Sequence, residues 1–263
     1  MLTNEQAKDI NNNKQASIAF YDDEKHDYQD FWIGRDYEHN SEIIALNKLL
    51  ANKHFALTMD YGGGYGRIAP ILLGFSDQLI LVDPSTQQLN IAKKRLSNFA
   101  NVEFVRVDQQ DSVPAENNTL DLLVMVRVSH HLADPAPTFA EIHRALKPGG
   151  LAIIEIANEA HFINRIKYLT KLKLVPKESV PIGKFANGIT DNTPFFNHNP
   201  KTITTLLKQN NLTVVDKLSV SNLRSKLLKN HMKMANMLKL ETSLQPMLSF
   251  MDFGPSIFLL VKK

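Results

Sequence analysis

Residues 55–66 read Phe55-Ala56-Leu57-Thr58-Met59-Asp60-Tyr61-Gly62-Gly63-Gly64-Tyr65-Gly66. An apolar run of strand length leads here into a glycine-rich turn, and a short helical pattern follows at residues 68–75. Glycine allows positive φ and lets the backbone pass close to a ligand. A strand, a glycine turn and a helix in this order predict a ligand-binding first unit of an α/β sheet, although the turn is a weak signal alone.

The chain after this turn alternates between strands and helices. Further strands are expected at 78–82, 102–107, 120–126 and 151–157. In the helix after the second strand, Ser85 and Gln88 have the spacing of a capping box. Leu89, Leu96 and Phe99 are expected to face the sheet. Five strands separated by helices predict a parallel sheet covered on both faces.

The flanking regions are less regular. Helices are expected at 40–52, 158–175, 200–209 and 223–240, strands at 212–220 and 256–261, and a loop at 176–199. The tail therefore adds two strands with helical insertions.

Composition excludes several classes of chemistry. The 263 residues contain no cysteine, which excludes disulfides, thiolate nucleophiles and cysteine-held metals. No apolar run is long enough for a membrane helix and no secretory signal is visible, so we expect a cytoplasmic protein without membrane insertion. Residues 165–239 are rich in lysine, which fits either an anionic partner or a solvated surface.

The carboxylate at the end of the first strand discriminates between ligands. A nicotinamide-type G-x-G-x-x-G pattern started at Gly62 needs glycine at position 67, which is Arg67. Asp60 would also repel a pyrophosphate. S-adenosylmethionine (SAM) carries an ammonium and a sulfonium, both cationic, and an acid beside the loop favours it.

Several motifs in order give the chain a family resemblance. They are Asp60–Gly66, Val82-Asp83, Val107-Asp108-Gln109, Leu120-Asp121-Leu122, Ser129-His130-His131-Leu132 and Leu146-Lys147-Pro148-Gly149-Gly150-Leu151. Over roughly residues 56–155 the chain resembles the class I SAM-dependent methyltransferases, especially the ubiquinone and menaquinone biosynthesis group with its methyltransferase type 11 domain. The resemblance implies a doubly wound α/β fold with a seven-stranded, mostly parallel, Rossmann-like sheet. It also implies SAM as the cofactor and helical lid insertions.

The resemblance also assigns cofactor contacts. Asp60 is expected near the ammonium, Asp83 at the ribose hydroxyls and Asp108 at the adenine amino group. Arg127 should border the sulfonium, and Arg35 could reach the carboxylate. The complete expected set is Asp60, Gly62, Gly63, Gly64, Gly66, Asp83, Pro84, Asp108, Gln109, Arg127 and Arg35. No metal ligand is expected.

Methyl transfer needs a general base only if the acceptor must lose a proton. His131 is the first candidate and His130 the second, although paired histidines are often structural. We expect residues 1–52 to form an N-terminal helical lid segment and residues 53–263 the SAM-binding domain, whose insertions at about 158–199 and 223–255 form the acceptor side.

These features favour a methyltransferase that acts on oxygen or carbon of a small molecule. Two alternatives stay open. One is an RNA or protein methyltransferase that uses the basic C-terminal third, although the Asn/Asp-Pro-Pro-aromatic motif of base methyltransferases is absent. The other is a SAM-binding protein without catalysis.

Overall fold

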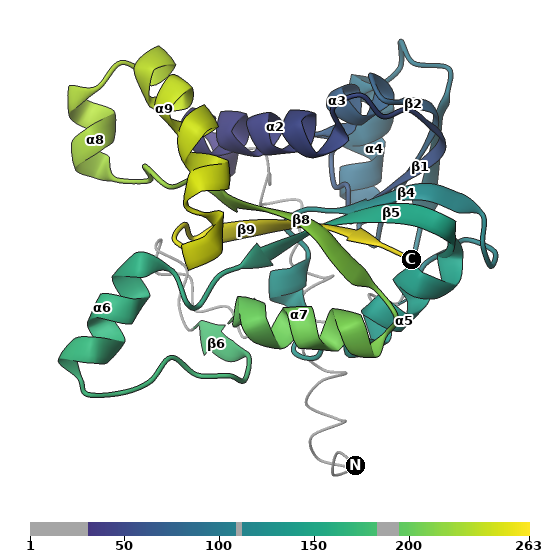
Figure 1. Cartoon of the computed structure of the whole chain (residues 1–263). Coiled ribbons are helices and arrows are strands. Elements are labelled where there is room, and N and C mark those ends of the chain that lie inside the picture. The colour runs from purple at the N-terminus through teal and green to yellow at the C-terminus, as the bar shows by residue number, and fades with distance from the viewer. Residues whose placement is uncertain (1–30, 109–111, 183–194) are drawn as a thin grey trace.

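The computed structural model describes residues 31–108, 112–182 and 195–263, so Gln109 lies outside the described residues. Its centre is a seven-stranded sheet in the order β3-β2-β1-β4-β5-β9-β8 (Figure 1). β1 to β5 are parallel, and β9 runs antiparallel between β5 and β8. The expected doubly wound, mostly parallel sheet is confirmed.

The strands are β1 (Phe55–Tyr61), β2 (Ser76–Asp83), β3 (Val102–Arg106), β4 (Leu120–Met125), β5 (Leu146–Ala157), β6 (Val180–Ile182), β7 (Phe195–Asn197), β8 (Thr213–Val220) and β9 (Ser256–Lys262). The α-helices are α2 (Asp36–Leu50), α3 (Ala69–Leu73), α4 (Thr86–Arg95), α5 (Ala136–Ala145), α6 (Phe162–Thr170), α7 (Pro200–Gln209), α8 (Lys226–His231) and α9 (Met234–Met247). Two short 3-10 helices are η2 (Ser129–His131) and η3 (Ser249–Met251).

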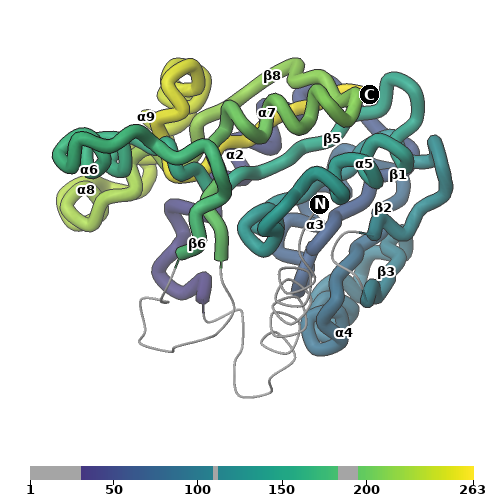
Figure 2. Tube along the Cα trace, turned by 90° about the horizontal axis from the view of Figure 1, so that it is seen from below, coloured from purple at the N-terminus to yellow at the C-terminus, as the bar shows by residue number. Residues whose placement is uncertain are grey.

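Helices cover both faces of the sheet because both faces of its central strands are apolar. On one face α2, α3 and α4 share a core cluster with the sheet, in which Leu46 and Leu72 are fully buried. On the other face α5 and α7 supply residues such as Phe139 and Leu207. Figure 2, which views the molecule from below, shows α5 and α7 in front of the strands.

Local signals explain several helix starts. The Ser85 hydroxyl accepts a hydrogen bond from the Gln88 backbone N–H at 3.1 Å, which is the N-cap half of the expected capping box. The other half does not form, because the Gln88 amide side chain has no hydrogen-bond partner within the described ranges. Asp134 accepts a hydrogen bond from the Ala136 backbone N–H at 3.0 Å at the start of α5.

Several sequence expectations were wrong in detail. The helix expected at 40–52 runs from 36 to 50, and the one at 158–175 is only α6. The single helix expected at 223–240 is two helices that break between residues 231 and 234. The loop at 176–199 contains β6 and β7. Phe99 lies past the end of α4 and is 40% exposed, so it does not face the sheet.

In the part of the chain that the structure describes, no helix is long and apolar enough to cross a membrane. No group of three histidines or acids in the same ranges could hold a metal ion.

Candidate functional site

A pocket opens where β1 and β4 lie side by side, at the carboxyl ends of the parallel strands. The chain leaves β1 toward β2 and leaves β4 toward β5, so the connections diverge here, as at the ligand crevice of open α/β sheets. The empty space between its walls amounts to about 870 Å³, which includes open solvent at its mouth. It is lined by Asp60, Tyr61, Gly62, Gly63, Gly64, Tyr65, Arg67, Ile68, Asp83, Pro84, Gln88, Val107, Val126, Arg127, Val128 and His131.

The glycine turn forms the floor of this pocket, and its conformation requires glycine. Gly62 has φ +74°, and a Cβ there would lie 2.2 Å from the Val128 side chain. A Cβ on Gly63 would lie 2.8 Å from the Asp60 carboxylate. Gly66 is not among the lining residues; a Cβ there would meet Leu96, so this glycine permits close packing against α4. The turn therefore holds the backbone against the pocket.

Asp60 is a buried acid that forms no ion pair with another residue that the structure describes. It is 1% exposed, and its Oδ2 atom has no hydrogen-bond partner among the described residues. Burial raises the pKa of Asp60 to about 7, although Arg67 acts in the opposite direction. A buried, unsatisfied carboxylate is costly unless a ligand pairs with it. This oxygen is therefore suited to receive a cation or a hydrogen-bond donor.

Asp83, the last residue of β2, links this strand to the glycine turn through a hydrogen bond. One carboxylate oxygen accepts a hydrogen bond from the Gly64 backbone N–H at 2.8 Å, and the other accepts from the Ser85 N–H at 2.9 Å. Asp83 and its neighbour Pro84 line the pocket. Asp83 therefore shapes the turn as well as facing the pocket.

Two charged residues that were expected to contact the cofactor do not line the pocket. The Asp108 side chain is 83% exposed and pairs with Arg106 at 3.3 Å. The Arg35 guanidinium stacks over the Phe31 ring at 3.6 Å, and Arg35 is not a lining residue. The structure therefore does not bring these two side chains to the pocket wall.

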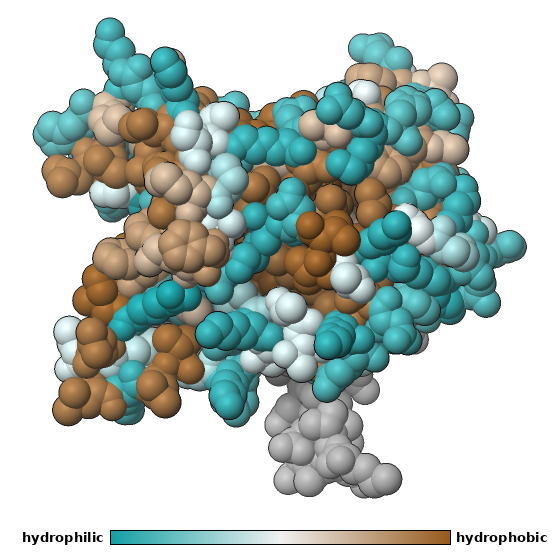
Figure 3. All heavy atoms as spheres, viewed as in Figure 1, coloured by the Kyte–Doolittle hydropathy of each residue, from teal (hydrophilic) through white to brown (hydrophobic). Residues whose placement is uncertain are grey.

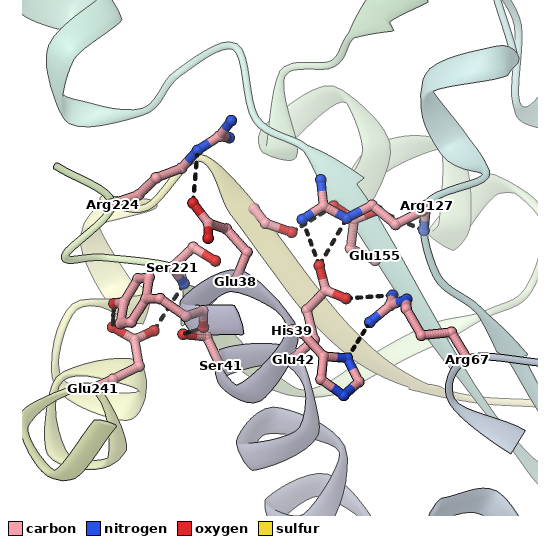
Figure 4. Close-up of polar contacts among 12 residues, drawn as sticks. Glu38, His39, Ser41, Glu42, Arg67, Arg127, Glu155, Ser221, Arg224 and Glu241 are labelled. Carbon is pink, nitrogen blue, oxygen red and sulfur yellow. Dashed lines mark hydrogen bonds and ion pairs between the residues drawn. The ribbon is translucent and has the colours of Figure 1, made fainter. Parts of the chain in front are cut away.

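A buried ionic cluster beside the pocket was not expected from the sequence. The Glu42 side chain is fully buried and binds Arg67 at 2.6 Å and Arg127 at 2.5 Å (Figure 4). Arg67 also contacts the His39 ring at 2.8 Å and lies over the Trp32 ring at 3.7 Å. Glu42 therefore holds two guanidinium groups next to the pocket. Arg67 could have been noticed beside Gly66; no sequence signal pairs it with Glu42.

The backbone of Arg127 is held in an unusual conformation. Its φ is +63°, which is uncommon for a residue with a side chain. Its N–H donates to Glu155 at 3.0 Å, and the other Glu155 oxygen accepts from the Ser256 hydroxyl. Burial raises the pKa of Glu155, while Arg127 opposes this rise. The left-handed turn directs the Arg127 guanidinium toward Glu42 rather than along β4.

His131 lies in η2, directly after β4, and lines the pocket. Its ring lies 4.2 Å from the His130 ring and 5.0 Å from the Phe195 ring, measured between centroids. Burial lowers the pKa of His131 to about 4, so the ring is neutral at pH 7. Burial also lowers the pKa of His130, with His131 and Arg127 acting in the same direction. A neutral imidazole at the pocket wall can accept a proton, but a conjugate-acid pKa of about 4 makes it a weak base.

The central part of the chain is similar to known methyltransferases. A family described as a methyltransferase domain matches residues 59–154. The ubiquinone/menaquinone biosynthesis C-methyltransferase UbiE of Pseudoalteromonas translucida is 25% identical over 154 residues, which are 56% of this chain and 59% of the relative. The ubiquinone biosynthesis O-methyltransferase of Thiobacillus denitrificans is 27% identical over 135 residues, 48% of this chain and 56% of the relative. The chain thus spans less than two thirds of the length of these relatives.

Solved structures share the fold. A SAM-dependent methyltransferase of Leishmania major has a TM-score of 0.61 at 15% identity and covers 95% of this chain and 83% of its own. A SAM-dependent methyltransferase of Thermotoga maritima is described as a possible histamine N-methyltransferase. It has a TM-score of 0.57 at 19% identity, and the match covers 90% of this chain and 94% of that protein. The fold is therefore the Rossmann-like methyltransferase fold. Residues 59–154 match a methyltransferase domain, and this match implies SAM as the cofactor.

The pocket residues fit this cofactor. The unsatisfied Asp60 oxygen suits an ammonium group, and the glycine turn leaves room for a ligand chain against the backbone. The guanidinium groups of Arg67 and Arg127, which line the pocket, suit a carboxylate. The pocket therefore offers opposite charges for the two ends of an amino-acid group.

Proposed function

We propose, from the methyltransferase domain at residues 59–154, that this protein transfers a methyl group from SAM to an oxygen or carbon atom of a small-molecule acceptor. The buried Asp60 carboxylate carries this proposal. An acid at the pocket wall whose Oδ2 atom has no hydrogen-bond partner in the described part of the chain favours a cationic ligand, whereas a dinucleotide would bring phosphates against it.

In this proposal separate pocket residues would hold the two charged groups of the cofactor's amino acid. Asp60 receives the ammonium. Arg67 and Arg127, which line the pocket and which Glu42 holds in place, receive the carboxylate. Arg67 thus takes the role that the sequence suggested for Arg35.

The nucleoside end of the cofactor lies toward β2. Asp83, which lines the pocket beside Pro84, would accept hydrogen bonds from the ribose hydroxyls. The buried Gln88 amide also lines the pocket and has no hydrogen-bond partner in the described chain. We assign it to the same polar end of the ligand. Asp108 and Gln109 remain proposed adenine contacts that follow β3.

The acceptor lies on the β4 side, between the domain and its insertions. Glu42, from the 1–52 segment, reaches the pocket arginines, and Phe195, from the 158–199 insertion, packs on His131. Bound SAM supplies an activated methyl group, so the chain must align the acceptor and exclude water. For a phenol or alcohol acceptor, the neutral His131 ring accepts the proton.

Calorimetric titration tests the cofactor assignment. SAM should bind and NAD should not. Asp60→Asn should weaken SAM binding by about tenfold to a hundredfold, the value of one charge-assisted hydrogen bond. Binding of 5′-methylthioadenosine, which lacks the amino-acid group, should be unchanged. Asp77→Asn, which alters an exposed acid, is the matched control. NAD binding, or equal loss for both adenosyl ligands, would contradict the assignment.

Transfer of a radiolabelled methyl group to a panel of phenols, alcohols and carbon acids tests the reaction. RNA and protein fractions belong in the same panel, because labelling of either class alone would refute a small-molecule acceptor. For a phenol acceptor, His131→Ala should slow turnover without changing SAM affinity. His54→Ala, at an exposed histidine, should change neither.

A further inference from the structure

Helix α6 is attached to the rest of the protein through its polar side chains. The Tyr168 hydroxyl donates to the Glu159 carboxylate at 2.6 Å, and the Asn164 amide donates to the Glu159 carbonyl at 3.2 Å. The Arg165 guanidinium donates to the Ala160 carbonyl. The polar side of α6 therefore faces inward.

Most of the apolar side of α6 faces solvent, although the Phe162 ring also stacks on the Phe253 ring with 4.9 Å between centroids. Phe162, Ile163, Ile166 and Leu169 are 43%, 67%, 46% and 72% exposed, and no residue of the helix is buried. Their positions at i, i+1, i+4 and i+7 place them on one face. A surface helix of a globular protein normally has the reverse orientation, with its apolar stripe on the core. We call these four residues the α6 apolar face.

The apolar surface continues beyond the helix. Leu172 and Leu174 are 94% and 92% exposed, and they alternate with Lys171 and Lys173. Figures 1 and 2 both show α6 projecting from the edge of the molecule, and Figure 3 shows brown apolar residues gathered in that region. Contiguous exposed apolar surface of this kind marks an interaction site.

Along residues 161–177 the charges have one sign, although Glu159 and Glu178 flank this stretch. Between residues 161 and 177 the chain carries Arg165, Lys167, Lys171, Lys173 and Lys177 and no acid. The four lysines are exposed, and within the described ranges none has an ion-pair partner. A second copy of the chain would bring the same positive charges against this face. The charge therefore favours an anionic occupant.

We propose that α6 and the Lys171–Leu174 segment dock this protein on an anionic lipid surface. An apolar face flanked by lysines is the pattern of helices that lie in the membrane interface. The leucine and isoleucine side chains enter the headgroup region, while the flexible lysines reach anionic headgroups. This is peripheral binding, and no part of the described chain needs to cross the bilayer.

Helix α6 follows the same edge of the sheet at which the pocket lies, so docking through α6 also positions the pocket relative to the lipid surface. α6 follows the carboxyl end of β5 after residues 158–161, and the pocket lies at the carboxyl edge of the same sheet. The β6–β7 pair, whose Phe195 contacts His131, comes next along the chain. Docking through α6 therefore brings the acceptor side of the pocket near the lipid surface.

Vesicle flotation tests the proposal with the whole protein. Wild type should bind vesicles of phosphatidylcholine mixed with phosphatidylglycerol and not vesicles of phosphatidylcholine alone, and added salt should weaken the binding. Lys171→Gln/Lys173→Gln should weaken binding roughly thirtyfold, at about 1 kcal/mol per lysine. Leu172→Ser/Leu174→Ser should weaken it at least about tenfold.

Matched controls alter the same residue types elsewhere. Lys93→Gln/Lys94→Gln changes an exposed lysine pair on α4, and Phe99→Ser removes an exposed apolar side chain nearby; both should bind vesicles like wild type. Failure of wild type to bind anionic vesicles, or equal effects of the control variants, would overturn the proposal. So would a dimer in solution that only the leucine variant dissociates, because a second copy would then cover this face. Vesicle binding needs neither SAM nor methyl transfer, so its outcome is separate from that of the proposed function.

Discussion

Replacing Glu42 by glutamine should destabilise the fold much more than its single lost charge suggests. The Glu42 side chain has 0% exposure, and its partners Arg67 and Arg127 are only 11% and 21% exposed. Burial alone would raise the pKa of Glu42, but Arg127 and Arg67 outweigh it and hold that pKa below its ordinary value. The carboxylate is therefore charged at pH 7, and its removal leaves two neighbouring guanidinium groups without their shared anion.

Removing one partner from a buried ion pair costs about 3–5 kcal/mol. We expect Glu42→Gln to lower the free energy of unfolding by this amount, a large part of the roughly 5–15 kcal/mol of a typical domain. Arg67→Gln should cost less, since Glu42 keeps Arg127. The double variant Glu42→Gln/Arg67→Gln should be less destabilised than the sum of the two single variants, because the second change removes an uncompensated cation.

Urea unfolding followed by circular dichroism measures these differences. The matched control is Glu141→Gln, which breaks the pair with Arg144 at 2.8 Å, where both side chains are 32% exposed. This pair should contribute about 0–1 kcal/mol. The Glu42 contribution should be complete above the ordinary glutamate pKa and should disappear as the pH falls through the lower folded-state pKa. A loss for Glu42→Gln no larger than that of the control would refute the reasoning.

Three further outcomes are expected at the pocket. Burial raises the pKa of Asp60 to about 7, so a proton must leave when an ammonium binds; SAM affinity should rise from about pH 5 to pH 7, and Asp60→Asn should abolish this dependence in calorimetry. Asp83→Ala should remove most SAM affinity and also lower the free energy of unfolding by about 1–3 kcal/mol, because two backbone donors lose their acceptor; a stable variant with unchanged affinity would contradict this. Gly62→Ala should lower the melting temperature, and Val128→Ala, which removes the clashing methyl groups, should partly restore it; no restoration would refute the clash.

The regular centre of the fold could be predicted because local signals and global packing agree there. Apolar runs of strand length, the glycine turn after Asp60 and the cap at Ser85 each specify one element, and parallel strands then need helices on both faces. The secondary structure of the insertions was harder to predict from the sequence. Residues 223–240 have a helical pattern throughout, but the break between α8 and α9 depends on packing. Short strands such as β6 exist only through pairing with β7.

The sequence by itself determined the sheet and the acid and glycines at its edge, because strand ends and turn conformations are encoded within a few neighbouring residues. Only the tertiary structure decided that Glu42, from a helix before the first strand, unites Arg67 and Arg127 beside the pocket, while Arg35 stacks on Phe31. It likewise decided that α6 turns its apolar side outward. A hydrophobic period shows that a helix has an apolar face, but what covers that face depends on residues far away in the chain.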